Sequence, residues 1–190
     1  MRSSADKMAT LMRFIRPTLL PLMCLSALGL ILSLLVHLGA LLGTGSALGE
    51  AAWFLHVGIF LVWIPAVLVL QPLTREFKQR DLWRAALRGC PTWMRWMTYG
   101  FFGYAAVNFI LFIFMAPGRT SSSATSAVVL RGFSGHWMAF YSAAVAIFYS
   151  ARHAEEYDLG RRCPSGHQVG PLAKYCEECG RQVLPAAGSR

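Results

Sequence analysis

Four long apolar runs dominate this sequence and restrict the class of fold it can adopt. Each is about 20 residues long, the length of an α-helix that crosses the hydrocarbon core of a bilayer. Only 14% of the 190 residues are charged, against about 25% in soluble domains. The sequence therefore predicts an all-α membrane protein with a four-helix transmembrane domain over residues 18–151. The predicted spans cover residues 18–42, 51–70, 92–115 and 133–151.

The basic residues predict the orientation of these spans. Lys and Arg collect in residues 1–17, in the segment 71–96 and after the fourth run, whereas the turn at 43–50 contains none. Short loops rich in Lys and Arg stay on the cytoplasmic side. We therefore expect a multi-pass protein of the bacterial cytoplasmic (inner) membrane, with a cytosolic N-terminal segment and both termini in the cytoplasm. This distribution explains most of the net charge of +9, so a nucleic-acid partner is not inferred.

The linker over residues 72–91 has an amphipathic pattern. Three of its arginines recur at every fourth position, and a group of its apolar residues gathers mostly on another face. The arginines are Arg80, Arg84 and Arg88, and the apolar residues are Leu82, Trp83, Ala86, Leu87 and Cys90. Such a segment can lie on the inner leaflet, with Trp83 and Leu87 among lipids and the arginines on anionic headgroups. The alternative is a solvated linker helix. We also expect Glu177 and Glu178 to contact these arginines.

Two features within the runs predict contacts between helices. Asn108 lies inside the third run, where its amide needs a protein partner, so it is expected to face another helix. The fourth run carries small residues on one helix face, which would let a neighbour approach closely. These are Ala139, Ala143, Ala146 and Ser150.

Residues 161–182 contain a metal-ligand pattern. Cys163-Pro-Ser-Gly-His167 is followed, after an eight-residue spacer, by Cys176-Glu-Glu-Cys179-Gly180. Three thiolates and one imidazole complete a tetrahedral Zn²⁺ site, and a site with all four positions filled is structural. So short a segment cannot bury a core, and metal binding would supply the folding energy. The alternatives are a reduced turn without metal and a disulfide.

This tail resembles the short zinc ribbons of bacterial proteins that carry the motif CPxGH, a spacer and CxxCG. The resemblance implies that Cys163, His167, Cys176 and Cys179 are the zinc ligands. The sequence departs from the commoner four-cysteine ribbon at His167, which stands one position later than the usual second Cys. As a whole, the chain resembles bacterial four-span membrane proteins with such a tail, and that resemblance implies no activity.

Three histidines lie near the ends of predicted spans: His37, His56 and His136. Ionisable residues inside a membrane are candidates for function, so the three could hold a haem or a second metal. The alternative is that they join Trp53, Trp137 and Tyr141 in the interfacial aromatic belt, or form hydrogen bonds between helices.

The sequence contains no recognisable catalytic pattern, such as Ser/His/Asp, HExxH or paired acids within the spans. We predict a non-enzymatic membrane protein that uses its zinc ribbon to bind an unknown protein partner, through Val169, Leu172 and Tyr175. The alternative function is a membrane redox protein or a haem- or metal-handling protein that uses the three histidines. A channel or transporter is disfavoured because the single Asn within the spans offers little polar pathway.

Overall fold

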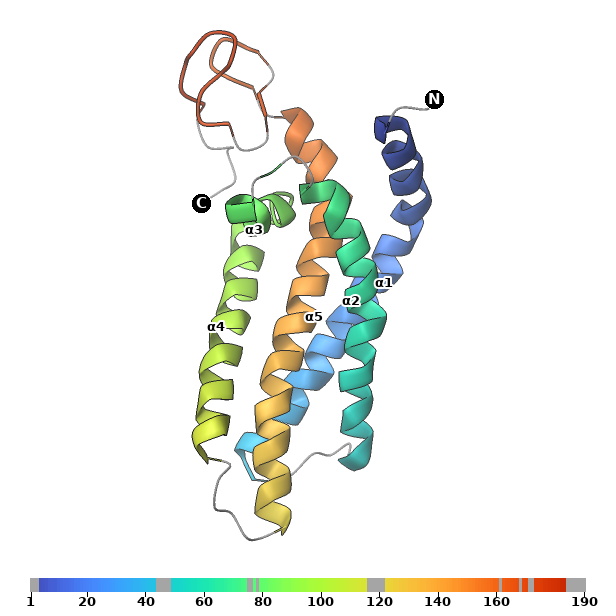
Figure 1. The fold of residues 1–190 in the computed structure, drawn as a ribbon, viewed down its shortest axis with the longest axis vertical. Helices are drawn as coiled ribbons and strands as arrows, with labels where there is room; N and C mark the ends of the chain where they lie inside the picture. Colours follow the sequence, from blue (N-terminus) through green and yellow to red (C-terminus); the bar gives the residue numbers. More distant parts are fainter. Residues whose placement is uncertain are drawn as a thin grey trace. The chain divides into compact units, whose positions relative to one another are not determined.

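The computed structural model describes residues 4–43, 49–74, 77, 79–115, 122–160, 162–167, 169–170 and 173–183. Over these residues the structure is helical apart from turns, irregular segments and isolated β-bridge residues (Figure 1). The all-α prediction is confirmed. The long helices are α1 (Ser4–Leu41), α2 (Trp53–Thr74), α4 (Thr92–Met115) and α5 (Ser122–Gly160), and the short elements are η1 (Gly49–Ala52), η2 (Gln79–Asp81) and α3 (Leu82–Ala86).

Three of these helices are long and apolar enough to span a membrane, which indicates a membrane protein. The spans are Ile15–Leu41, Glu50–Gln71 and Thr92–Phe114, close to the first three predicted runs. The fourth predicted run lies within α5, which does not meet the same standard of hydropathy. Its apolar residues are interrupted by serines and by His136.

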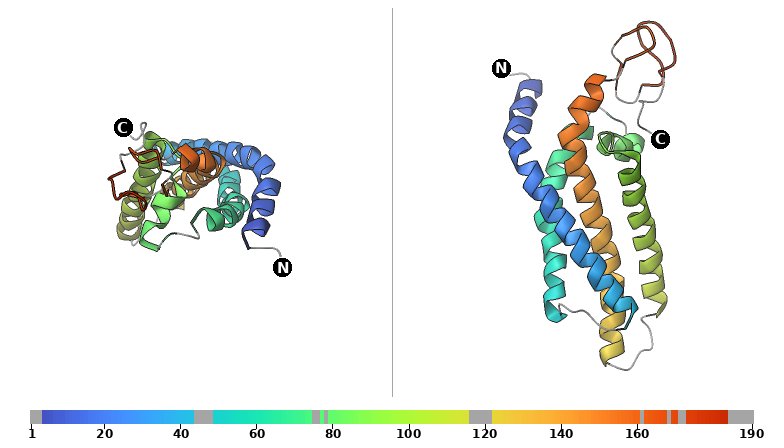
Figure 2. Two further views of the ribbon diagram at one scale, coloured as in Figure 1. Left: turned by 90° about the horizontal axis from the view of Figure 1, so that it is seen from above. Right: turned by 180° about the vertical axis from the view of Figure 1, so that it is seen from behind.

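The chain divides into two compact units. The first contains Met1–Leu20, Val67–Arg95 and Ala146–Arg190, and the second contains Pro21–Ala66 and Trp96–Val145. In the second unit, α5 lies between α2 and α4 (Figure 2). The largest fully buried side chain is Trp137 of α5, whereas Phe54 of α2 and Phe114 of α4 are 77% and 79% exposed. Within the second unit α5 is therefore the core helix, and its neighbours turn large apolar side chains outward.

Tyr141 of α5 fills a notch made by two glycines. A Cβ atom at Gly29 of α1 would collide with the Tyr141 ring, and one at Gly58 of α2 would lie 2.5 Å from its hydroxyl oxygen. The Tyr141 hydroxyl donates a hydrogen bond of 2.8 Å to the carbonyl of Leu55. On α4, Asn108 donates through Nδ2 to the Arg131 carbonyl at 2.8 Å. The expectation that Asn108 faces another helix is confirmed.

In the first unit, the linker packs against the small residues of α5. The Gly89 N–H donates to the Ser150 hydroxyl at 3.1 Å, and the Cys90 thiol donates to the Ala146 carbonyl at 3.1 Å. Leu87 is fully buried in protein, so the expectation that it lies among lipids is wrong. Helix α3 has only five residues, of which Ala85 and Ala86 are buried in protein and Trp83 is half-buried.

The linker arginines make two different kinds of contact. Arg88 donates to the carbonyls of Leu73 and Ala85 at 2.6 and 3.1 Å, near the C-terminal ends of α2 and α3. Arg80 and Arg84 instead flank the Asp81 carboxylate, at 3.5 and 3.9 Å, and remain largely exposed. Arg88 therefore satisfies backbone carbonyls that have no partner inside their own helices.

The glycine notch generates the first prediction. Gly29→Ala should lower the free energy of unfolding by about 1–3 kcal/mol, because the added methyl group forces the Tyr141 ring out of its position. Thermal unfolding of the detergent-solubilised protein measures the loss. Gly100→Ala on α4 is the matched control, since its Cβ meets nothing within 4 Å. An equal loss in the background Tyr141→Leu would show that the ring is not the cause.

Candidate metal centre

The tail forms two tight turns, each closed by a glycine with positive φ. In the first turn, the Gly166 N–H donates to the Cys163 carbonyl at 2.8 Å, and Gly166 has φ 87°. In the second, the Gly180 N–H donates to the Cys176 carbonyl at 2.9 Å, and Gly180 has φ 68°. Glycine adopts this backbone region without strain. The glycines of CPSGH and CEECG are therefore required by the shape of the two turns.

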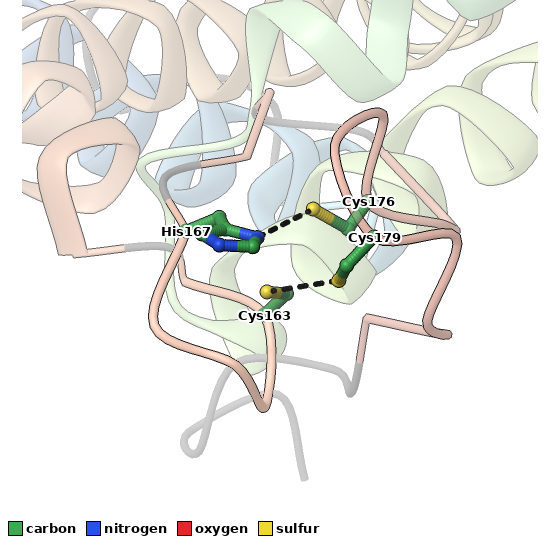
Figure 3. A group of neighbouring side chains, drawn as sticks. All are labelled: Cys163, His167, Cys176 and Cys179. Carbon is green, nitrogen blue, oxygen red and sulfur yellow. Dashed lines mark hydrogen bonds between the residues drawn. The ribbon is translucent and has the colours of Figure 1, made fainter.

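These turns bring four metal-ligating side chains together. Cys163, His167, Cys176 and Cys179 each offer one ligand atom, and these atoms lie within 4.8 Å of one another (Figure 3). The Sγ atoms of Cys163 and Cys179 are 3.7 Å apart, and Cys176 Sγ is 3.6 Å from His167 Nδ1. This group could hold a metal ion.

The two distances match the edges of a tetrahedron around zinc. Zn–S bonds of about 2.3 Å and Zn–N bonds of about 2.0–2.1 Å at tetrahedral angles give S–S and S–N separations of about 3.8 and 3.6 Å. A disulfide would require sulfurs about 2.05 Å apart. All three cysteines are free thiols in the structure. The side chains are thus spaced for a shared ion and not for a disulfide.

Groups around Cys179 favour its thiolate over its thiol. Hydrogen bonds from the Arg181 backbone N–H and the Ser165 hydroxyl lower the pKa of Cys179 to about 6. The Glu178 carboxylate lies 3.6 Å from His167 Nδ1. Sequence reasoning missed Ser165 and Arg181, because a backbone N–H leaves no mark in the residue pattern. The expected contact of Glu177 and Glu178 with the linker arginines stays a prediction; in the contacts described, Arg80 and Arg84 flank Asp81.

The tail has almost no apolar core of its own. Its buried residues are Cys163, Val169, Cys176 and Val183, with Ala173 and Cys179 packed against them. Val169 belongs to this small core, so its predicted role as an exposed docking residue is wrong. Tyr175 is 61% exposed, and Leu172 lies outside the described residues. Since half of the small core consists of ligand cysteines, a bound metal would hold the tail together.

His37 takes part in a hydrogen-bond network that joins three helices. Its Nδ1 is 2.8 Å from the Ser134 hydroxyl, which itself donates to the Leu130 carbonyl at 2.6 Å. Ser134 therefore accepts from His37, and the Tyr104 hydroxyl donates to His37 Nε2. Both ring nitrogens of His37 are occupied.

His56 and His136 lie beside one another and apart from this network. Their ring centroids are 5.8 Å apart, and the Trp137 indole N–H donates to His56 Nδ1 at 3.0 Å. Over the described residues, the tail cluster is the one group of three or more possible metal ligands. The structure thus brings together two of the three histidines, and the hypothesis that they bind haem or a second metal stays a prediction.

No family model, curated protein or solved structure matches this chain.

The metal centre generates the second prediction. The purified native protein should contain about one zinc ion per chain, measured by mass spectrometry of the metal. The double variant Cys176→Ser/Cys179→Ser should lose it, and its tail should become sensitive to protease because the metal supplies the folding energy. Cys24→Ser, which changes an exposed cysteine of α1, is the control. Full metal content in the double variant would contradict the assignment.

Proposed function

We propose that this protein is a non-enzymatic, four-span protein of the cytoplasmic membrane whose cytosolic tail is a structural zinc ribbon for protein interaction or assembly. The observation that carries the proposal is the convergence of Cys163, His167, Cys176 and Cys179 at tetrahedral spacing. Three thiolates and one imidazole suit zinc among the common divalent ions. With four protein ligands, no position is left for water or substrate, which favours a structural role.

The burial of α5 supports a fourth span. A helix in a membrane needs an apolar surface only where it meets lipid. Much of α5 is instead fully buried in protein, including Ala143, Ala144, Ala146, Ile147 and Phe148. The serine hydroxyls of this segment form hydrogen bonds within the protein. Ser142, for example, donates to the Ala139 carbonyl at 2.9 Å. A helix covered in this way can cross a bilayer without the high hydropathy of its neighbours.

The exposed surface of the tail supports a role in docking. Tyr175 is 61% exposed although it pairs with Gln182 in the β-bridge beside the second turn. Aromatic side chains that keep one polar end are common anchors at protein interfaces. We also propose that the exposed Arg80 and Arg84 contact anionic lipid headgroups of the inner leaflet.

Topology provides the third prediction. Four spans place both termini on the same side of the membrane, whereas three spans place them on opposite sides. Reporter fusions at residue 45, at residue 77 and after residue 183 should report the outside, the cytoplasm and the cytoplasm, respectively. A periplasmic signal from the last fusion, with the other two as expected, would reduce the protein to three spans and exclude a cytosolic tail.

Docking provides the fourth prediction. Tyr175→Ala should keep zinc but lose the proteins that co-purify with the native chain from its own membrane, because it removes an anchor without touching a ligand. Gln182→Ala, which changes the other residue of the bridge, is the matched control. Quantitative mass spectrometry of the co-purified proteins measures the effect. If the double variant Cys176→Ser/Cys179→Ser retains the same partners, the tail is not the docking module.

A further inference from the structure

His56 and His136 form a polar pair inside a cluster of aromatic side chains in the second unit. The His56 ring lies 5.8 Å from Phe133 and 6.3 Å from Phe60, measured between centroids. The His136 ring lies 5.3 Å from Phe133 and 6.4 Å from Phe140. Three of these contacts have ring planes at 79–85°, the edge-to-face arrangement that aromatic rings favour, and the Phe133–His136 contact is tilted at 60°.

A hydrogen bond from the rest of the protein fixes where the proton of the His56 ring lies. Because Trp137 donates to His56 Nδ1, the neutral His56 ring carries its proton on Nε2. A neutral His136 ring carries its proton on one nitrogen, so its other nitrogen is an acceptor. The pair thus presents one donor, from His56, and one acceptor, from His136.

The position of the proton on the neutral His56 ring argues against a metal ion at this pair. A metal ligand needs a free lone pair, and the partner of its other nitrogen normally accepts a proton from the ring. Trp137 does the opposite, because it donates to the ring. A ligand that suits the pair must accept one hydrogen bond and donate another, and a single hydroxyl group does both.

The surroundings define the rest of the ligand. The pair lies within the helices α2 and α5, where α2 is a membrane span. Phe60, beside His56, is 59% exposed, so the cluster is open on the face that meets lipid. A ligand that arrives from the bilayer must be soluble in lipid, and a flat aromatic ring continues the edge-to-face packing.

We propose that His56 and His136 bind the head group of a lipid-soluble quinol. One quinol hydroxyl accepts from His56 Nε2–H and donates to the acceptor nitrogen of His136, while Phe60, Phe133 and Phe140 contact its ring. The oxidised quinone has carbonyl oxygens in place of hydroxyls, so it keeps the bond from His56 and loses the bond to His136. This binding does not depend on the zinc tail.

Binding of a decyl-benzoquinol to the full chain in detergent micelles, kept anaerobic, tests the proposal. Trp53 and Trp137 lie beside the pair, so quenching of tryptophan fluorescence reports binding. The native protein should bind the quinol about tenfold more tightly than decyl-benzoquinone, the effect of one hydrogen bond. His136→Phe should remove this preference by weakening the quinol alone. His56→Phe should weaken both forms.

The control is His153→Phe, the same change at another histidine of α5, which contacts Tyr149 in the first unit. It should bind like the native protein. Equal affinity of the native protein for quinol and quinone would overturn the proposal, and this comparison needs no variant that could misfold. Displacement of the quinol by an equal concentration of decanol would also overturn it, because decanol supplies the hydroxyl without the ring.

Discussion

A polar side chain in hydrocarbon has no water to bond, and the structure of the second unit depends on this constraint. The polar groups of α5 bond to its neighbours: Ser134 accepts from His37 of α1, and Tyr141 donates to the Leu55 carbonyl of α2. Asn108 of α4 donates to the α5 backbone. Because each bond is lost if α5 moves outward to lipid, the polar residues that lower its hydropathy also hold it in the core.

Small residues make these bonds geometrically possible. Gly29 and Gly58 admit the Tyr141 ring, and a Cβ at Gly135 would collide with the Asn108 amide. In the first unit, Ala146 and Ser150 leave their backbone carbonyl and hydroxyl open to Cys90 and Gly89 of the linker. Helix association in membranes relies on such close packing, since lipid is as apolar as the helices themselves.

The sequence predicted what depends on local pattern and missed what depends on neighbours. The length of the apolar runs predicted the three apolar spans. The spacing of the Cys and His residues predicted the cluster of Cys163, His167, Cys176 and Cys179. The amphipathic pattern of the linker could not reveal that Leu87 is buried in protein instead of lying among lipids. Similarly, Trp137 follows His136 directly, yet only the crossing of α5 and α2 shows that it bonds to His56.

The number of positive charges in the linker explains only part of the role of its arginines. A positive charge anywhere in this segment would orient the helices. Arg88 and Arg95, however, also bond to carbonyls: Arg88 to Leu73 and Ala85, and Arg95 to Cys90 and Arg88 at 2.9 Å each. The planar guanidinium reaches two acceptors at once, whereas a lysine ammonium is a compact point charge. Arg88 therefore also closes the ends of α2 and α3, and its replacement by lysine would keep the positive charge but not the planar fork that reaches both carbonyls.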